Sequence, residues 1–109
     1  MFIVGTSLGD VSVGNRKQFA TERLHLLAHT KIESITSTSE ILIDGLSGIE
    51  IIATGLDQDS KTNLTVYQVM LFPQNGGYVL MVGLVGKANG KEYMPKFVRM
   101  AKTYKMSQP

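Results

Sequence analysis

The sequence predicts an α+β fold, in which an antiparallel meander sheet of four or slightly more strands is flanked by an N-terminal and a C-terminal helix. Apolar residues repeat at helical spacing near both ends of the chain, and β-branched residues alternate with a period near two between them. The turns between the predicted strands are short, so sequential strands are antiparallel neighbours, because a parallel crossover needs about a dozen residues or more. A chain of 109 residues has room for one domain, spanning residues 1–109.

Residues 16 to 30 predict the first helix, with Asn15 as its N-cap. One broad arc of this helix is apolar and consists of Phe19, Ala20, Leu24, Leu26 and Leu27. The opposite arc is polar and consists of Gln18, Glu22, His25 and His29. The segment is therefore amphipathic, and we expect it to lie on an apolar surface.

Four strands are predicted between the helices, over residues 32–44, 49–53, 64–72 and 78–85, with an irregularity near Ser39. A further short β-prone piece, residues 2–4, precedes a predicted turn over residues 5–10. The 78–85 segment is apolar at odd and even positions alike, which indicates a strand buried on both faces at the centre of the sheet. If both helices cover one face, a second molecule must cover the other, so we expect a homodimer.

Two glycines, Gly45 and Gly48, bracket a short gap after an apolar run in the stretch IDGLSGIEIIATG. A phosphate-binding loop requires a glycine-rich turn that leads from a strand into a helix. Here β-branched residues resume within a few positions. An Asp-Gly pair between two apolar runs is typical of a hairpin, in which glycine supplies the positive φ. We therefore predict a bend between two strands.

Residues 90 to 105 predict the second helix, because Met94, Phe97, Ala101 and Tyr104 recur at i, i+3, i+7 and i+10. Pro95 is expected near its first turn, where a missing N–H costs little. This helix lies in the basic part of the chain. From Lys87 onward there are six basic residues and one acidic residue, against five basic and eight acidic in the remainder.

The second helix carries a basic face formed by Lys96, Arg99, Lys102 and Lys105. The simpler interpretation is a solvated face whose cations lie near the helix C-terminus, where they complement the helix dipole. The alternative is weak binding of nucleic acid or of an anionic surface. Because no known nucleic-acid-binding motif accompanies these residues, no nucleic-acid partner is expected.

Glu22, His25 and His29 are the candidate metal ligands, since spacings of i, i+3 and i+7 place them on one helical face. Two imidazoles four residues apart can share a zinc ion with a carboxylate. The metalloprotease motif requires Glu directly after the first His, and here that residue is Leu26. An exposed polar face is the simpler interpretation, and a metal-dependent enzyme is the alternative; we expect no cofactor.

Other candidates for chemistry also lack their full pattern. Ser47, in GLSGI, does not have the spacing of a nucleophile elbow. Asp57, Asp59 and Asn63 lack the twelve-residue calcium pattern with its terminal Glu, and are expected to form a turn. The sequence therefore predicts no catalytic residue.

The whole chain contains no cysteine, which excludes disulfides, thiolate metal sites and cysteine nucleophiles. The N-terminus lacks the basic and apolar regions of a signal peptide, and the longest strongly apolar run, residues 78–85, is too short to span a bilayer. We expect no membrane span. The expected compartment is the cytoplasm, or the periplasm or the exterior if the chain is a processed fragment of an exported protein.

Three stretches resemble, in order, the C-terminal two-thirds of PsbP-like domains, and the resemblance covers about residues 16 to 105: SEILIDGLSGIEIIATG, VYQVMLFPQNGGYVLMVGLVG and YMPKFVRMAKTYK. The residues that carry it are Ile43, Gly45 and Gly48 at the hairpin, Tyr67 to Phe72 in the long strand, Gly77, Tyr78 and Gly83 around the next strand, and Phe97, Met100 and Tyr104 in the closing helix. The family has bacterial members and includes a Ran-binding nuclear transport factor.

This resemblance implies an antiparallel sheet between helices, a binding or assembly role, and no catalytic residue. PsbP-like domains usually begin with a further strand hairpin ahead of the first helix, whereas only about fourteen residues precede Asn15 here. We therefore expect either a short variant or a missing N-terminal part, with an open sheet edge that a dimer would shield. The expected function is non-enzymatic binding through protein–protein contacts, either to another protein or to a second copy.

Overall fold

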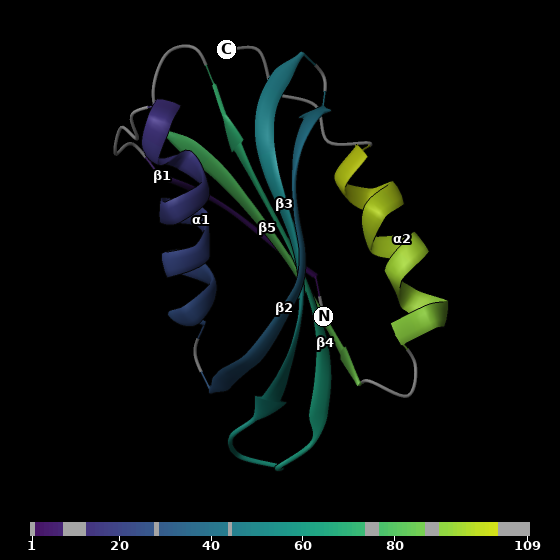
Figure 1. Ribbon diagram of the computed structural model, residues 1–109. Coiled ribbons are helices and arrows are strands. Elements are labelled where there is room, and N and C mark those ends of the chain that lie inside the picture. Colours follow the sequence, from purple (N-terminus) through teal and green to yellow (C-terminus); the bar gives the residue numbers. More distant parts are fainter. Residues whose placement is uncertain are drawn as a thin grey trace.

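The computed structural model describes residues 2–7, 13–27, 29–43, 45–73, 77–86 and 90–102, and these form an α+β fold as predicted (Figure 1). In chain order the elements are β1 (Phe2–Ser7), the 3-10 helix η1 (Val13–Asn15), α1 (Arg16–His25), β2 (Thr30–Ile43), β3 (Leu46–Asp57), β4 (Asn63–Phe72), β5 (Tyr78–Gly86) and α2 (Gly90–Lys102). Neither helix has the length and apolar character that crossing a bilayer requires, as far as the described residues extend.

The five strands form one sheet in the order β1-β5-β4-β3-β2, and every neighbouring pair is antiparallel. The predicted meander is confirmed in β2 to β5. The predicted turn after residue 4 is wrong for residues 5–7, because β1 pairs with β5 continuously from Phe2, opposite Gly83, to Ser7, opposite Tyr78. This added strand makes β5 an inner strand of the sheet.

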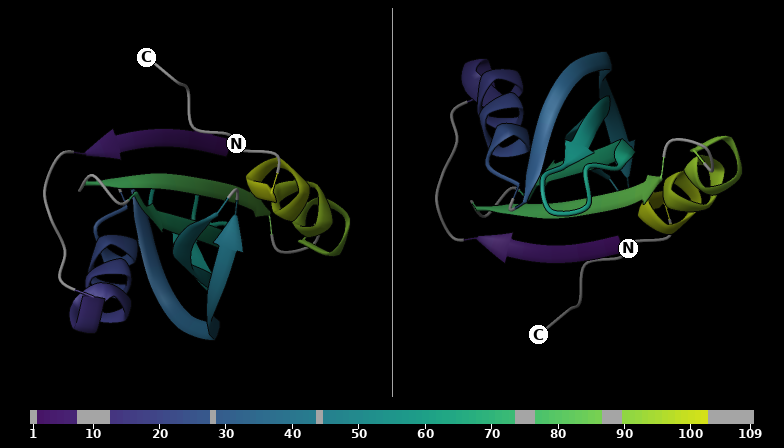
Figure 2. Two further views of the ribbon diagram at one scale, coloured as in Figure 1. Left: turned by 90° about the horizontal axis from the view of Figure 1, so that it is seen from above. Right: turned by 90° about the horizontal axis from the view of Figure 1, so that it is seen from below.

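The two helices lie on opposite faces of the sheet (Figures 1 and 2). On one face, Ala20 and Leu24 of α1 belong to a buried cluster with Ile49, Ile51, Ala53, Leu64, Val66, Met70 and Phe72. On the other face, Phe97 and Ala101 of α2 belong to a cluster with Ile43, Tyr67, Val69, Leu71, Val79 and Met81. The sequence required a second molecule only if both helices covered the same face. They cover opposite faces, so this argument for a dimer does not apply.

The most deeply buried strand is β4, the third of the five. All residues from Val66 to Phe72 are buried, on both faces, whereas Leu80, Leu84 and Val85 of β5 are only half-buried. The sequence predicted the centre of the sheet in the 78–85 segment, because that segment is the most uniformly apolar. Position in the strand order decides burial here, since β4 has two long neighbours and a helix over each face.

The first helix ends at His25, earlier than predicted. The N–H of Leu26 donates to the carbonyl of Arg23 at 3.1 Å, and the N–H of Leu27 donates to that of Leu24 at 3.3 Å, which tightens the last turn. Leu26 consequently leaves the apolar arc and is 69% exposed, which corrects its predicted placement. Asn15 precedes α1 as predicted, but its side chain makes no capping hydrogen bond.

Two further predictions are wrong in detail. Pro95 is the sixth residue of α2 and lies in its second turn, beyond the first turn where a missing N–H costs little, so it removes one hydrogen bond of the helix interior. The irregularity of β2 occurs between Ile32 and Ser34 and again between Ile35 and Ser37, whereas Ser39 pairs regularly with Glu50.

The β2–β3 connection is the predicted hairpin. Gly45 has a φ of 77°, in the left-handed region that glycine adopts without a steric cost. Gly48 lies inside β3, where it pairs with Ile41 and Leu71, so it takes no part in the turn. Asp44, the first residue of the predicted Asp-Gly pair, lies outside the described residues.

Close packing of α2 on the sheet requires a glycine at position 83. A Cβ atom at Gly83 would lie 2.6 to 2.8 Å from three ring carbons of Phe97. The ring is 3% exposed and belongs to the cluster beneath α2, so it has little freedom to move aside. The absence of a side chain at Gly83 thus sets how closely α2 approaches β5.

We predict that Gly83→Ala destabilises the protein by about 1–3 kcal/mol, the usual cost of inserting a methyl group into a packed core. The matched control is Gly86→Ala in the same strand, where an added Cβ meets no atom within 4 Å. Its free energy of unfolding should change by less than about 0.5 kcal/mol. Urea unfolding followed by circular dichroism compares the two, and equal losses would show that Phe97 does not constrain position 83.

Candidate functional site

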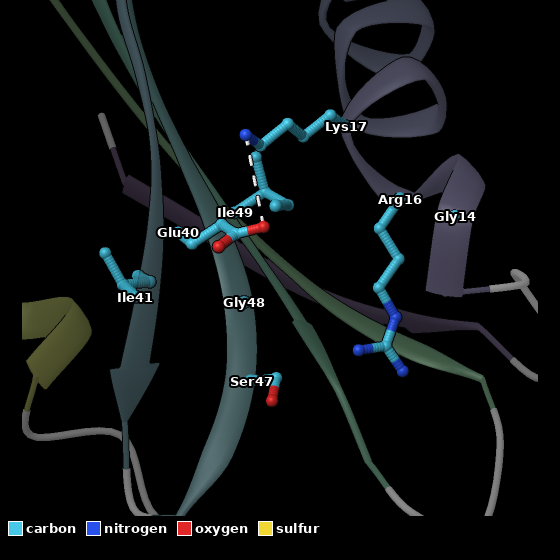
Figure 3. Close-up of a pocket in the computed structure, with 8 residues that line it drawn as sticks. All are labelled: Gly14, Arg16, Lys17, Glu40, Ile41, Ser47, Gly48 and Ile49. Carbon is cyan, nitrogen blue, oxygen red and sulfur yellow. Dashed lines mark ion pairs between the residues drawn. The ribbon is translucent and has the colours of Figure 1, made fainter.

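A cavity of about 430 Å³ lies between the start of α1 and the hairpin end of β2 and β3 (Figure 3). The helix side contributes Gly14, Arg16 and Lys17, and the strand side contributes Glu40, Ile41, Ser47, Gly48 and Ile49. Figure 3 shows Arg16 and Lys17 extending from the helix toward these strands. The cavity therefore has a cationic wall facing a polar one.

The sequence places two cations at the start of a helix, which is electrostatically the wrong end. Partial positive charge from the free N–H groups accumulates there and disfavours lysine and arginine. In α1 the first turn holds Arg16 and Lys17 but no acidic residue, and Asn15 leaves its N–H groups without a side-chain cap. The cavity wall is therefore a region of concentrated positive charge.

Arg16 is held in place by an aromatic ring. Its Cζ atom lies 4.5 Å from the centroid of the Phe72 ring, over the ring face. Phe72 is the last residue of β4 and is buried, so it forms a fixed platform. The Nε of Arg16 is buried, and within the described parts of the chain it has no hydrogen-bond partner. The guanidinium is thus positioned but not saturated with hydrogen bonds.

Lys17 makes only a weak contact across the cavity. Its Nζ lies 4.0 Å from Oε1 of Glu40, and the two side chains are 59% and 77% exposed. Exposed ion pairs of this kind contribute at most about 1 kcal/mol to the stability of the folded protein. Glu40 reaches the cavity because it pairs with Ile49 in the β2–β3 ladder and so lies on the face that α1 covers.

A second cavity, of about 530 Å³, lies at the other end of the same sheet face. Its interior is mostly apolar and is lined by Leu27, Leu64, Val82, Leu84 and Val85, together with Thr30 and Gly86. His29, Asp57 and Asp59 are its charged or ionisable lining residues. Nδ1 of His29 lies 3.1 Å from Oδ2 of Asp59, and the two side chains are 72% and 73% exposed.

The structure separates the three candidate metal ligands. Glu22 and His25 lie on α1, where Glu22 accepts a hydrogen bond from Nε2 of Gln18 at 3.2 Å. His29 lies beyond the helix, in a turn with a φ of 58°, so the shared helical face assumed in the sequence analysis is wrong. In the described residues no group of three or more His, Cys, Asp or Glu side chains is arranged to hold a metal ion.

The other sequence candidates are located as follows. Lys96, Arg99 and Lys102 are exposed on α2, and Lys105 lies outside the described residues. Nζ of Lys96 lies 4.9 Å from the centroid of the Tyr93 ring. Asp57 forms the predicted turn, because its Oδ1 accepts from the N–H of Asp59 at 2.9 Å and from that of Ser60 at 3.2 Å.

Two buried polar residues of β4 were not identified from the sequence. Tyr67 is fully buried, and its hydroxyl donates a hydrogen bond to Oε2 of Glu50 at 2.7 Å. On the opposite face Gln68, also fully buried, donates from Nε2 to the carbonyl of Ala20 at 2.8 Å, which ties α1 to the sheet. Both residues lie in a run of apolar residues. Their hydrogen-bond partners become visible only once the strands are paired in register.

Comparison with known proteins supports the fold. No family model matches the chain, and no curated protein matches it. The crystal structure of PA94 from Pseudomonas aeruginosa, a protein of unknown function suggested to be a regulator, is similar with a TM-score of 0.73 and 13% sequence identity. The match covers 99% of this chain and 73% of PA94. At this identity the similarity shows a shared fold.

We predict that Tyr67 makes stability fall at alkaline pH. Burial raises the pKa of Tyr67 well above its ordinary value of 10.0, and the hydrogen bond to Glu50 and its charge raise it further. Above pH 10 the unfolded chain releases this proton while the folded chain keeps it. The free energy of unfolding should therefore decrease by about 1.4 kcal/mol per pH unit.

Tyr67→Phe is the comparison that isolates this contribution. At about pH 8 the variant should be less stable by about 1.5–3 kcal/mol, the value of a hydrogen bond to a charged group. Above pH 10 the difference should shrink, because the variant cannot ionise. Urea titrations between about pH 8 and pH 11 measure both curves, and parallel curves would contradict the assignment.

Proposed function

We propose that this chain is a non-enzymatic, PsbP-like binding domain that holds a partner protein at the cavity beside Arg16. The PsbP-like resemblance supports a binding or assembly role. The cavity supports a location, because charged and hydroxyl groups from α1, β2 and β3 converge there around an open space. A second copy of the chain is the alternative partner.

The observation that carries this proposal is the state of Arg16. Leaving a buried donor without a partner costs about 1–3 kcal/mol, and a cation at a helix start is unfavourable as well. Arg16 combines both features, on a fixed aromatic platform. An anionic group of a partner bound at this guanidinium would offset the unfavourable position of the cation, and the free protein therefore holds an unused binding group.

The composition of the cavity favours binding over catalysis. Its polar side chains are Arg16, Lys17, Glu40 and Ser47, and no histidine is among the described residues that line it. Both Lys17 and Glu40 are largely exposed to solvent. Active sites usually shield their reacting groups from water, and this exposed pair is not shielded.

We predict that partner capture depends on Arg16. Immobilised wild-type protein should retain a specific protein from an extract of the source organism, and Arg16→Gln should lose it. The matched control is Arg23→Gln, which removes a second arginine of α1 that also has a buried, unpartnered Nε among the described residues but does not line the cavity. Mass spectrometry of the eluates identifies the retained protein.

Retention of the same protein by wild type and both variants would place the interface elsewhere on the surface. Retention by none of the three would contradict a binding function at this cavity. Sedimentation velocity of the purified chain examines the alternative partner, because self-association through the cavity should also be weakened by Arg16→Gln and not by Arg23→Gln.

A further inference from the structure

We infer that the cavity beside Arg16 recognises a carboxylate group, and that Glu40 of the same chain competes with this ligand for Lys17. The inference builds on the proposed binding function and names the chemistry of the bound group. Three features carry it: the fixed position of Arg16, the balance of charge in the cavity, and the weakness of the Lys17–Glu40 contact.

The fixed position of Arg16 suits a planar anion. The contact with the Phe72 ring, 4.5 Å from Cζ to the ring centroid, holds the guanidinium in place. Arginine binds carboxylates through two parallel N–H···O bonds, and a fixed guanidinium loses little entropy when it does so. Because Nε of Arg16 is buried, the two terminal N–H groups of the guanidinium, at the end of the side chain in Figure 3, supply these donors.

The balance of charge indicates a monoanion. Among the described residues, two cations, Arg16 and Lys17, line the cavity against one carboxylate, Glu40. One added carboxylate makes the site neutral, whereas a phosphate monoester would bring about 1.5–2 negative charges and leave an excess. A carboxylate is also what acidic side chains and the C-terminus of a partner protein supply.

Glu40 is a weakly held competitor. At 4.0 Å its Oε1 lies at the limit of an ion pair with Nζ of Lys17, and both side chains are mostly exposed. An incoming carboxylate therefore replaces Glu40 at Lys17 at little cost, while Glu40 stays at the cavity wall and still counts in the charge of the site. Ser47, from the paired strand β3, adds a hydroxyl donor to the same wall of the cavity, as Figure 3 shows.

The experiment titrates the full chain with sodium acetate at constant ionic strength, with sodium chloride as the balancing salt. Two-dimensional ¹H–¹⁵N spectra follow the Nε–H of Arg16 and the backbone N–H groups of Gly14, Lys17, Ser47 and Gly48. Wild type should show a saturable shift at these positions. Arg16→Gln should weaken acetate binding at least about tenfold, as expected for a lost charge-assisted pair.

Two variants separate this effect from a loss of folding. Glu40→Gln replaces an exposed side chain and should tighten acetate binding by up to about fivefold, because it removes the competing charge. Arg23→Gln should leave binding unchanged, since Arg23 does not line the cavity. Shifts that are absent, unsaturable, or the same in wild type and Arg16→Gln would overturn the site. Unchanged or weaker binding in Glu40→Gln would overturn the role of Glu40.

A parallel titration with inorganic phosphate distinguishes the two oxyanions. Acetate binding that equals or exceeds phosphate binding supports the carboxylate assignment, and binding of phosphate alone overturns it. The outcome is also separable from that of the proposed function. If the chain binds acetate at Arg16 but captures no protein, the carboxylate site stands and the protein-binding function is rejected. If it captures a protein but binds no acetate, the protein-binding function stands and the carboxylate site is rejected.

Discussion

Burial of both faces of β4 constrains the rest of this structure. The strand is the third of five, and its residues from Val66 to Phe72 are buried whichever face they point to. A sheet that is apolar on both faces at its centre must be covered on both faces, and the chain achieves this with one helix on each. The order of layers, helix, sheet and helix, follows from this requirement (Figure 2).

Polar groups within β4 add specificity to that arrangement. Gln68 donates to the backbone of Ala20 on the α1 face, and Tyr67 donates to Glu50 on the α2 face. A buried amide or hydroxyl loses its water on folding, so each is stable only where a partner lies at the correct distance. These bonds therefore favour one position of α1 and one register of β3 over alternatives that hydrophobic packing alone would tolerate.

The candidate site is a consequence of the same packing. Docking of α1 brings its first residue, Arg16, over Phe72, the last residue of β4, while the β2–β3 hairpin supplies Glu40 and Ser47 opposite. The helix start is electrostatically unsuited to two cations, and the aromatic ring compensates in part. The two cations at the helix start thus break the rule that this end of a helix disfavours positive charge. They do so at the cavity, where the proposed binding role gives a reason for them.

The sequence by itself determined the fold class, the hairpin at Gly45 and the meander from β2 to β5. These follow from local periodicity, turn residues and connection length, which act over a few neighbouring positions. It also contained one unused signal for the site, the adjacent cations Arg16 and Lys17 at a helix start without an acidic residue. The residues that surround them were not predictable, because Glu40, Ser47 and Phe72 lie on three different strands, far from Arg16 in the sequence.

Tertiary structure alone decided which face each helix covers. Because the helices cover opposite faces, a dimer is not needed to cover a bare face. It also decided that β4, and not the more apolar β5, lies at the centre, and that β1 pairs beyond β5. The early end of α1, which separates His29 from Glu22 and His25, belongs here as well. Each of these outcomes depends on contacts between residues far apart in the chain, and side-chain periodicity carries no information about such contacts.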